Sequence, residues 1–130
     1  MKQIEKEEIC PFCIDNLARF HKKKILKLTL HWLVTKNQWP YQNTRVHLLA
    51  IYREHAENIS EISPEAGKEL FEIIRWAEEE YKITSGALAM RFGDISGNGA
   101  TVSHIHAQIL SAKITNRSDP KYIPVRVRVG

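Results

Sequence analysis

A glycine-rich turn that leads into a strand-forming segment with histidines at alternate positions is the feature that most constrains this chain. The turn, residues 97–99, reads Gly-Asn-Gly, and residues 100–110 read Ala-Thr-Val-Ser-His-Ile-His-Ala-Gln-Ile-Leu. Successive side chains of a strand point to opposite faces of a sheet. We therefore expect His104, His106 and Gln108 to share one polar face, and the apolar residues between them to face the core.

The chain is long enough for one domain with its own core. It has 130 residues, of which 43% are hydrophobic and 26% charged, an ordinary globular composition. Residues 1–9 are mostly charged and are expected to form a solvated leader, so the single domain spans residues 10–130. The sequence has no apolar run of about 18 residues and no signal-peptide core. We expect a cytoplasmic protein with no membrane partner.

Strand and helix patterns predict an α+β fold. Strands are expected at residues 25–35, 45–52, 86–92 and 100–110, and the alternation at 125–129 suits an edge strand or an arm on another subunit. The segments 86–92 and 100–110 are expected to pair antiparallel. A long helix over residues 64–82 is expected to begin with Ser63 as its cap and Pro64 in the first turn. The expected architecture is an antiparallel sheet of about five strands, with this one long helix on one face and the functional site on the other.

The two cysteines form one Cys-x-x-Cys pair, Cys10 and Cys13. In a reducing compartment this spacing indicates either half of a zinc site or a thioredoxin-like redox pair. The redox interpretation requires a strand before the pair and a long helix after it, and neither pattern is present.

Several histidines are available for the other half of a zinc site, because zinc prefers four ligands from Cys and His. His104 opens the histidine segment and His55 ends a predicted strand, so both are candidates. His21 and His31 compete with them, and His31 suits a hydrogen-bonded structural role better than a ligand role.

The second histidine of the alternating set has a different chemistry. An imidazole is largely neutral near pH 7, so His106 suits a nucleophile or a general base. The backbone N–H groups of residues 97–99 suit an anion, and the amide of Gln108 binds an oxygen without titrating. The net charge of +4 also favours anionic partners, from phosphate-bearing small molecules to nucleic acid. The alternative is a strand that serves only as a metal site or a polar surface.

The segment 104–110, preceded by Gly-Ala-Thr-Val at 99–102, resembles the signature of the histidine triad (HIT) superfamily, in the variant with glutamine in place of the third histidine. Other pieces follow in the order of that family: the cysteine pair, the Trp-Pro-Tyr loop from Asn37 to Tyr41, the strand ending at His55, the helix start at Ser63 and the glycine turn. The resemblance covers about residues 10–110.

The resemblance implies a specific chemistry. Members of this superfamily bind nucleotides and cleave or transfer at the α-phosphorus through a nucleotidyl-histidine intermediate, and the nucleophile corresponds to His106. In zinc-bearing members the metal ligands correspond to Cys10, Cys13, His55 and His104. Members commonly form symmetric dimers, so a homodimer is expected, with residues 125–129 as a dimer element.

The resemblance also implies contacts to a nucleotide. The residues expected in catalysis are His106, Gln108 and Thr101, and those expected to bind nucleotide or phosphate are Asn37, Tyr41, Asn98, Gly99, Thr101, Ser103 and Gln108. Many members place an asparagine ahead of the glycine turn as a phosphate contact. This chain has Phe-Gly-Asp at 92–94 instead, so that contact is missing or is supplied by Arg91 or Asn98.

The leading expectation is a hydrolase of dinucleoside polyphosphates or nucleoside phosphoramidates. Gln108 resembles the branch that contains galactose-1-phosphate uridylyltransferases and diadenosine tetraphosphate phosphorylases, so a nucleotidyltransferase or phosphorylase is the close alternative. A zinc-stabilised module that binds nucleotide or nucleic acid without turnover is an alternative of another class. Nucleic acid is disfavoured because the basic residues are dispersed, and because Trp32 and Phe71 are expected on apolar faces.

Overall fold

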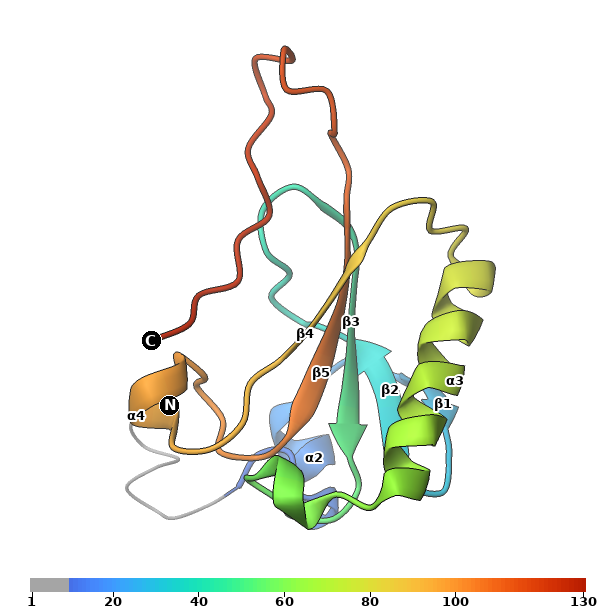
Figure 1. Ribbon diagram of the computed structural model, residues 1–130, viewed down its shortest axis with the longest axis vertical. Helices are drawn as coiled ribbons and strands as arrows, with labels where there is room; N and C mark the ends of the chain where they lie inside the picture. Colours follow the sequence, from blue (N-terminus) through green and yellow to red (C-terminus); the bar gives the residue numbers. More distant parts are fainter. Residues whose placement is uncertain (1–9) are drawn as a thin grey trace.

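The computed structural model describes residues 10–130, and the predicted leader at 1–9 lies outside the described residues. Figure 1 shows the arrangement of the elements. In chain order they are α2 (Ile14–Phe20), β1 (Ile25–Leu28), β2 (Trp32–Lys36), β3 (Thr44–Tyr52), the 3-10 helix η1 (Ile59–Glu61), α3 (Pro64–Glu80), β4 (Ala87–Met90), α4 (Ile95–Asn98) and β5 (His106–Ala112).

The strands form one five-stranded antiparallel sheet in the order β1-β2-β3-β5-β4. The long helix α3 packs against one face of the sheet (Figure 1). The expected α+β architecture is therefore confirmed, including the antiparallel pairing of the strands on either side of the glycine turn. The central pair is β3 with β5, in which Leu49 lies opposite Gln108 and Ile51 lies opposite His106.

The segment 25–35, predicted as one strand, is a hairpin made of β1 and β2. Thr29 closes its turn, because the Thr29 N–H donates to the Trp32 carbonyl at 2.9 Å and the Trp32 N–H donates to Thr29 Oγ1 at 3.1 Å. The single-strand prediction was wrong because the run contains no glycine, proline or asparagine to mark a turn. In this hairpin the Thr29 side chain closes the turn in place of those residues.

Two further boundaries differ from expectation. The histidine strand begins at His106, since residues 101–104 form bends that place His104 before the strand. Residues 125–129 are extended but belong to no strand, although their exposure alternates: Val125 and Val127 are half-buried, and the arginines between and after them are exposed.

The larger core lies between the sheet and α3. Trp32, Ile73 and Ile105 are fully buried in it, and the Trp32 indole N–H donates to the Ala66 carbonyl at 2.8 Å. Ser63 caps the helix as predicted, since its hydroxyl oxygen accepts from the Ala66 N–H. The prediction that Phe71 lies on an apolar face was wrong, because it is 68% exposed and lies off the stripe that faces the sheet.

A smaller cluster covers the opposite face of the sheet. It consists of Leu17 from α2 with Leu33, Leu49 and Ile51, and Phe12 packs against it. This cluster fixes α2 and the segment before it against the face on which His106 and Gln108 lie. Within residues 10–130, every helix is too short or too polar to cross a bilayer.

His21, at the end of α2, is buried and hydrogen-bonded. Its Nε2 lies 2.9 Å from Thr35 Oγ1, and the Thr35 hydroxyl in turn donates to the Lys24 carbonyl at 2.8 Å. The Thr35 oxygen therefore accepts a hydrogen bond from the N–H at His21 Nε2. Burial lowers the pKa of His21 below its usual value of 6.5.

This burial predicts a pH dependence of stability. The unfolded chain protonates His21 near pH 6.5 and the folded chain only at lower pH, so the free energy of unfolding falls as pH drops through about 6.5. Replacing His21→Gln removes that proton uptake, so the variant should lose less stability between about pH 7 and pH 5 than the wild type. Urea denaturation of both proteins with excess zinc measures this difference. Equal losses in the two proteins would contradict it.

Candidate active site and zinc site

Four side chains from distant parts of the sequence bring their donor atoms together. The ligand atoms of Cys10, Cys13, His55 and His104 all lie within 4.8 Å of one another. Cys10 Sγ is 3.2 Å from His104 Nδ1, and Cys13 Sγ is 3.2 Å from His55 Nδ1. Two thiols and two imidazoles in this arrangement match the donor set of tetrahedral structural zinc sites. The structure therefore brings together all four residues that were predicted to hold zinc, and their donor set supports zinc as the cofactor.

The ends of three elements supply these ligands. Cys13 is the N-cap residue of α2, His55 follows β3, and His104 precedes β5. The cysteine turn is held locally, since the Asn16 side-chain amide donates to the Cys10 carbonyl at 3.0 Å. A metal at this point ties the N-terminal turn to the two central strands.

The acid–base chemistry of the two thiols is also consistent with a bound cation. Burial, with an added contribution from Cys10, raises the pKa of the Cys13 thiol to about 12. Two adjacent thiolates are therefore unfavourable on their own. A divalent cation supplies the positive charge that deprotonates coordinating thiols.

Hydrogen bonds hold both imidazoles in the tautomer that suits a metal. His104 Nε2 donates to the Tyr52 carbonyl at 2.6 Å, and His55 Nε2 donates to Glu57 Oε2 at 3.1 Å. Glu57 Oε1 accepts from the Ser103 hydroxyl at 2.6 Å, and this bond, together with the one from His55, lowers the pKa of Glu57. Such partners orient ligating histidines and raise their basicity, leaving Nδ1 free for the metal.

His106 is oriented by the same segment. Its Nδ1 donates to the His104 carbonyl at 2.7 Å, which leaves Nε2 without a proton. The Phe12 ring packs edge-on against the imidazole, with 4.9 Å between centroids. Burial lowers the pKa of His106 to about 4. At neutral pH the ring is neutral, so Nε2 carries a free lone pair suited to nucleophilic attack.

A cavity of about 480 Å³ contains His106 and Gln108. Among the described residues 10–130, no carboxylate lines it, and Arg91 is the one fully charged residue in its lining. The lining residues are Pro11, Phe12, Phe20, His21, Asn37, Gln38, Trp39, Tyr41, Leu49, Arg91, Gly99, Thr101, Val102, His106 and Gln108. A cavity with one free imidazole and one guanidinium favours an anionic ligand.

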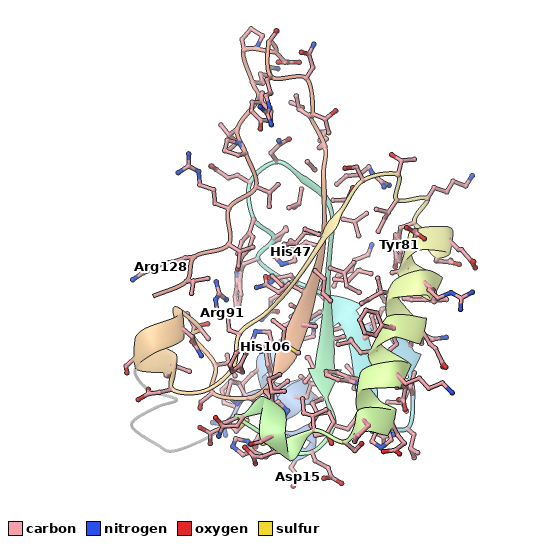
Figure 2. The ribbon with its side chains drawn as sticks, in the orientation of Figure 1. Asp15, His47, Tyr81, Arg91, His106 and Arg128 are labelled. Atoms are coloured by element: carbon pink, nitrogen blue, oxygen red, sulfur yellow. The ribbon has the colours of Figure 1, made fainter. Side chains whose placement is uncertain are left out.

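A histidine that the sequence analysis missed fixes the amide of Gln108. The Tyr41 N–H donates to His47 Nδ1 at 3.2 Å, so the proton of this imidazole is on Nε2. His47 Nε2 then donates to Gln108 Oε1 at 2.7 Å. Within residues 10–130 the Gln108 amide nitrogen has no protein partner, so its two N–H groups are available in the cavity. Figure 2 shows His47 and His106 in the central region of the sheet.

The sequence contains a signal that could have identified His47. It is the one polar residue in the apolar run at 46–51, and its parity along β3 places it on the same face as Leu49. A polar residue held inside an apolar strand has a partner. The sequence could not identify that partner as Gln108.

Most of the residues predicted to bind nucleotide meet at this cavity. Those that line it are Asn37, Tyr41, Gly99, Thr101 and Gln108. Asn98 and Ser103 do not line it. Asn98 braces its own loop, donating to the Phe92 carbonyl and accepting from the Ala100 N–H, while the Ser103 hydroxyl is bound to Glu57.

The structure also shows where the residues considered as alternative phosphate contacts and alternative zinc ligands lie. Of the two residues considered as replacements for the phosphate contact of relatives, Arg91 lines the cavity and Asn98 does not. Neither His21 nor His31 belongs to the zinc group. His31 has the structural role expected of it, because its Nδ1 lies 2.7 Å from Glu69 Oε2 and its N–H donates to Glu69 Oε1.

Comparisons with known proteins agree on the fold. A HIT family hydrolase from Clostridium thermocellum is 26% identical, with a TM-score of 0.59, over 88% of this chain and 96% of that one. A histidine triad protein from Clostridium difficile is 17% identical, with a TM-score of 0.63, over 84% and 96%. A zinc-bound histidine triad family protein from Mycobacterium smegmatis is 18% identical, with a TM-score of 0.62, over 88% and 83%. No family model and no curated protein matches the sequence.

Because Glu57 accepts a hydrogen bond from His55, we predict that Glu57 strengthens zinc binding. Replacing Glu57→Gln removes the carboxylate that polarises His55, and loss of such a partner typically weakens metal affinity about 10- to 100-fold. Competition with a chromophoric chelator measures the zinc affinity. Glu65→Gln, an equivalent change in the first turn of α3, is the matched control and should retain wild-type affinity. An unchanged affinity in Glu57→Gln would contradict this role.

Proposed function

We propose that this chain, which has the histidine triad fold, is a zinc-containing nucleotidyl hydrolase. Its substrates would be dinucleoside polyphosphates or nucleoside phosphoramidates, cleaved at the α-phosphorus through a nucleotidyl intermediate on His106. The observation that carries the proposal is the unprotonated Nε2 of His106, which results from the hydrogen bond that Nδ1 donates to the His104 carbonyl. The described part of the chain places no carboxylate in the lining of the cavity around it. The similarity to a HIT family hydrolase supports it.

The chemistry proceeds in two displacements. In the first, the lone pair of His106 Nε2 forms a bond to the α-phosphorus, and the bond from phosphorus to the leaving group breaks with its electron pair on the leaving atom. In the second, a water oxygen attacks phosphorus, the P–N bond breaks, its electron pair returns to Nε2, and the water proton passes to solvent. A covalent intermediate divides one difficult displacement into two easier ones.

Three groups around His106 suit the phosphoryl oxygens. The amide N–H groups of Gln108 are fixed by His47 and stabilise negative charge without titrating. Arg91 adds a permanent positive charge at the same cavity, in the role that an asparagine has in many relatives. The Thr101 hydroxyl, also in the lining, is suited to assist the departing oxygen or nitrogen.

The nucleoside would occupy the apolar part of the cavity. Trp39 and Phe20 present aromatic surface there, and Trp39 is 77% exposed. The loop that carries Trp39 is fixed, because the Gln38 amide donates to the Phe20 carbonyl and the Trp39 N–H donates to Asn37 Oδ1. Binding energy from this rigid platform holds the phosphorus near His106.

Zinc, when bound, supplies structure rather than an open coordination position, because four protein ligands complete its shell. The cysteine turn that joins the ligand group also carries Phe12, whose ring packs against His106. The residues of this turn thereby connect the metal site to the orientation of the nucleophile. The two cysteines require a reducing compartment to remain ligands, which agrees with the cytoplasmic location that we predict.

A second candidate is a nucleotidyltransferase or a dinucleoside polyphosphate phosphorylase with the same nucleophile. Gln108 favours it, because a buried amide, 3% exposed, cannot take a proton from water in the second displacement. An acceptor such as phosphate is already ionised and needs no base. The two candidates differ only in what resolves the intermediate.

We also propose a homodimer. The outer edge of β4 has no partner strand among the described residues, and the half-buried Val125 and Val127 line a hollow of about 340 Å³ beside it. Unpaired edges with nearby apolar surface favour association with a second copy. Sedimentation of the full chain at the monomer mass would contradict this.

Product analysis tests the proposed function. We expect diadenosine polyphosphates to yield adenosine monophosphate from water, with the same products when inorganic phosphate is present. Adenosine diphosphate formed only with phosphate would instead establish the phosphorylase. His106→Asn should lose at least about a thousandfold in kcat while still binding adenosine monophosphate, because only the nucleophile is removed. Full activity in His106→Asn would contradict the mechanism, and binding without turnover by the wild type would indicate a nucleotide-binding module.

A further inference from the structure

The charges of the chain are unevenly distributed along the sequence. Residues 16–53 contain eight lysines and arginines and no aspartate or glutamate, so this segment carries a formal charge of +8, whereas the whole chain carries +4. The eight residues are Arg19, Lys22, Lys23, Lys24, Lys27, Lys36, Arg45 and Arg53. The segment includes β1 and β2, which lie at one edge of the sheet. It therefore brings positive charge, and no carboxylate of its own, to that edge.

A hollow of about 290 Å³ lies in this region, and three of the eight cations line it. Lys23 precedes β1, Lys36 ends β2 and Arg45 lies in β3, so separate parts of the chain supply the charges. We call it the basic hollow. Its other lining residues are Asn37, Pro40, Thr44, Val46, His47, Leu48 and Tyr81. Within residues 10–130 no carboxylate lines the basic hollow, so its charge favours an anion.

The ammonium groups of Lys23 and Lys36 are exposed and have no protein partner among the described residues. The neighbouring Lys22 differs, because its Nζ donates to the Arg19 carbonyl at 3.1 Å. The backbone that carries the two lysines is nevertheless fixed. The Lys22 N–H donates to Gln38 Oε1 at 3.0 Å, and Lys36 lies in the ladder between β2 and β3. The basic hollow thus has two available positive charges on a rigid support.

The end of helix α3 adjoins the basic hollow through Tyr81 (Figure 1). Arg45 Nη1 donates to the Tyr81 carbonyl at 2.9 Å, and Arg45 Nη2 donates to the Lys82 carbonyl at 3.4 Å. The carbonyls at the end of a helix carry about half an elementary negative charge, which repels an anion. Because the Arg45 guanidinium covers these carbonyls with a full positive charge, this side of the hollow stays positive.

The basic hollow is distinct from the His106 cavity, although the two share a wall. Asn37 is the one residue that the described linings of both have in common. The Asn37 N–H donates to the His47 carbonyl at 2.9 Å, and His47 Nε2 donates to Gln108 Oε1 at 2.7 Å. An anion in the basic hollow would therefore lie on the His47 side of this wall, away from the nucleophile that we propose.

We propose that the basic hollow is a second ligand site, which binds a small phosphate-bearing anion outside the His106 cavity. This inference does not depend on the proposed function. Lysine ammonium groups bind phosphate oxygens as point charges, and three cations from separate elements suit one multiply charged group. A volume near the lower limit of ligand pockets, about 300 Å³, favours a small ligand.

A titration followed residue by residue tests the proposal. Inorganic phosphate and glycerol 3-phosphate are the two probes, added separately to the zinc-loaded full chain. The backbone amide resonances of Thr44 and Tyr81 report on the basic hollow, and those of Thr101 and Val102 report on the His106 cavity. We expect saturable shifts at Thr44 and Tyr81 with at least one probe. A lower Kd for glycerol 3-phosphate would identify an organic phosphate as the ligand, and equal Kd values would identify free phosphate.

Two double variants with the same change in net charge locate the site. Lys23→Gln combined with Lys36→Gln removes both ammonium groups of the basic hollow. We expect it to raise the Kd measured there about tenfold, since each exposed charge contributes a severalfold effect. Lys22→Gln combined with Lys24→Gln removes two charges of the same basic run that lie outside the lining. At physiological salt this matched control should keep the wild-type Kd within about twofold.

Three results would overturn the inference. The first is the absence of a saturable shift at Thr44 and Tyr81 with either probe. The second is a set of shifts confined to Thr101 and Val102, which would place the phosphate in the His106 cavity. The third is an equal rise of the Kd in the two double variants, which would show attraction by net charge alone. None of these measurements requires turnover, so the test holds even if the proposed function fails.

Discussion

The structure depends most on the three bonds made by the single residue His104. Its Nδ1 faces the thiols of the zinc group, its Nε2 donates to the Tyr52 carbonyl, and its own carbonyl accepts from His106 Nδ1. The same residue therefore belongs to the zinc group and orients the nucleophile that we propose, His106. Any displacement of the ligand group displaces the acceptor that sets the tautomer of His106. The zinc site and the candidate catalytic site form one physical unit, although their functions differ.

The two faces of the sheet have different roles: one packs into the core, and the other carries the candidate site. Ile105, Ala107 and Ile109 pack into the core beneath α3, which fixes the backbone of β5. His106 and Gln108 then project to the other face with no freedom to exchange sides. On that face, His47 directs the Gln108 amide and Phe12 restrains the His106 ring. A rigid imidazole beside fixed neutral donors suits the phosphoryl chemistry that we propose.

Sequence reasoning predicted the features that depend on local sequence pattern or on ligand chemistry. The opposite faces of β5 follow from the period of a strand, and the four zinc ligands follow from the resemblance, because ligand identity is constrained by the metal. It did not predict the turn at Thr29, where a side chain replaces the usual turn residues. It did not predict the side-chain bonds of Asn98 and Ser103, which brace the loop and hold Glu57. The partner of His47 depends on a contact between distant segments, which no local pattern encodes.

The most direct measurement is the mass of the protein during turnover. Rapid quenching of the reaction with a diadenosine polyphosphate, followed by peptide mapping under conditions that preserve phosphoramidate bonds, identifies any covalent adduct. The bond between His106 Nδ1 and the His104 carbonyl leaves only Nε2 to react, so the adenylyl group should be found on the peptide that contains His106. Turnover with adenylylation of another residue, or with no adduct at any quench time, would contradict the central claim that His106 is the nucleophile.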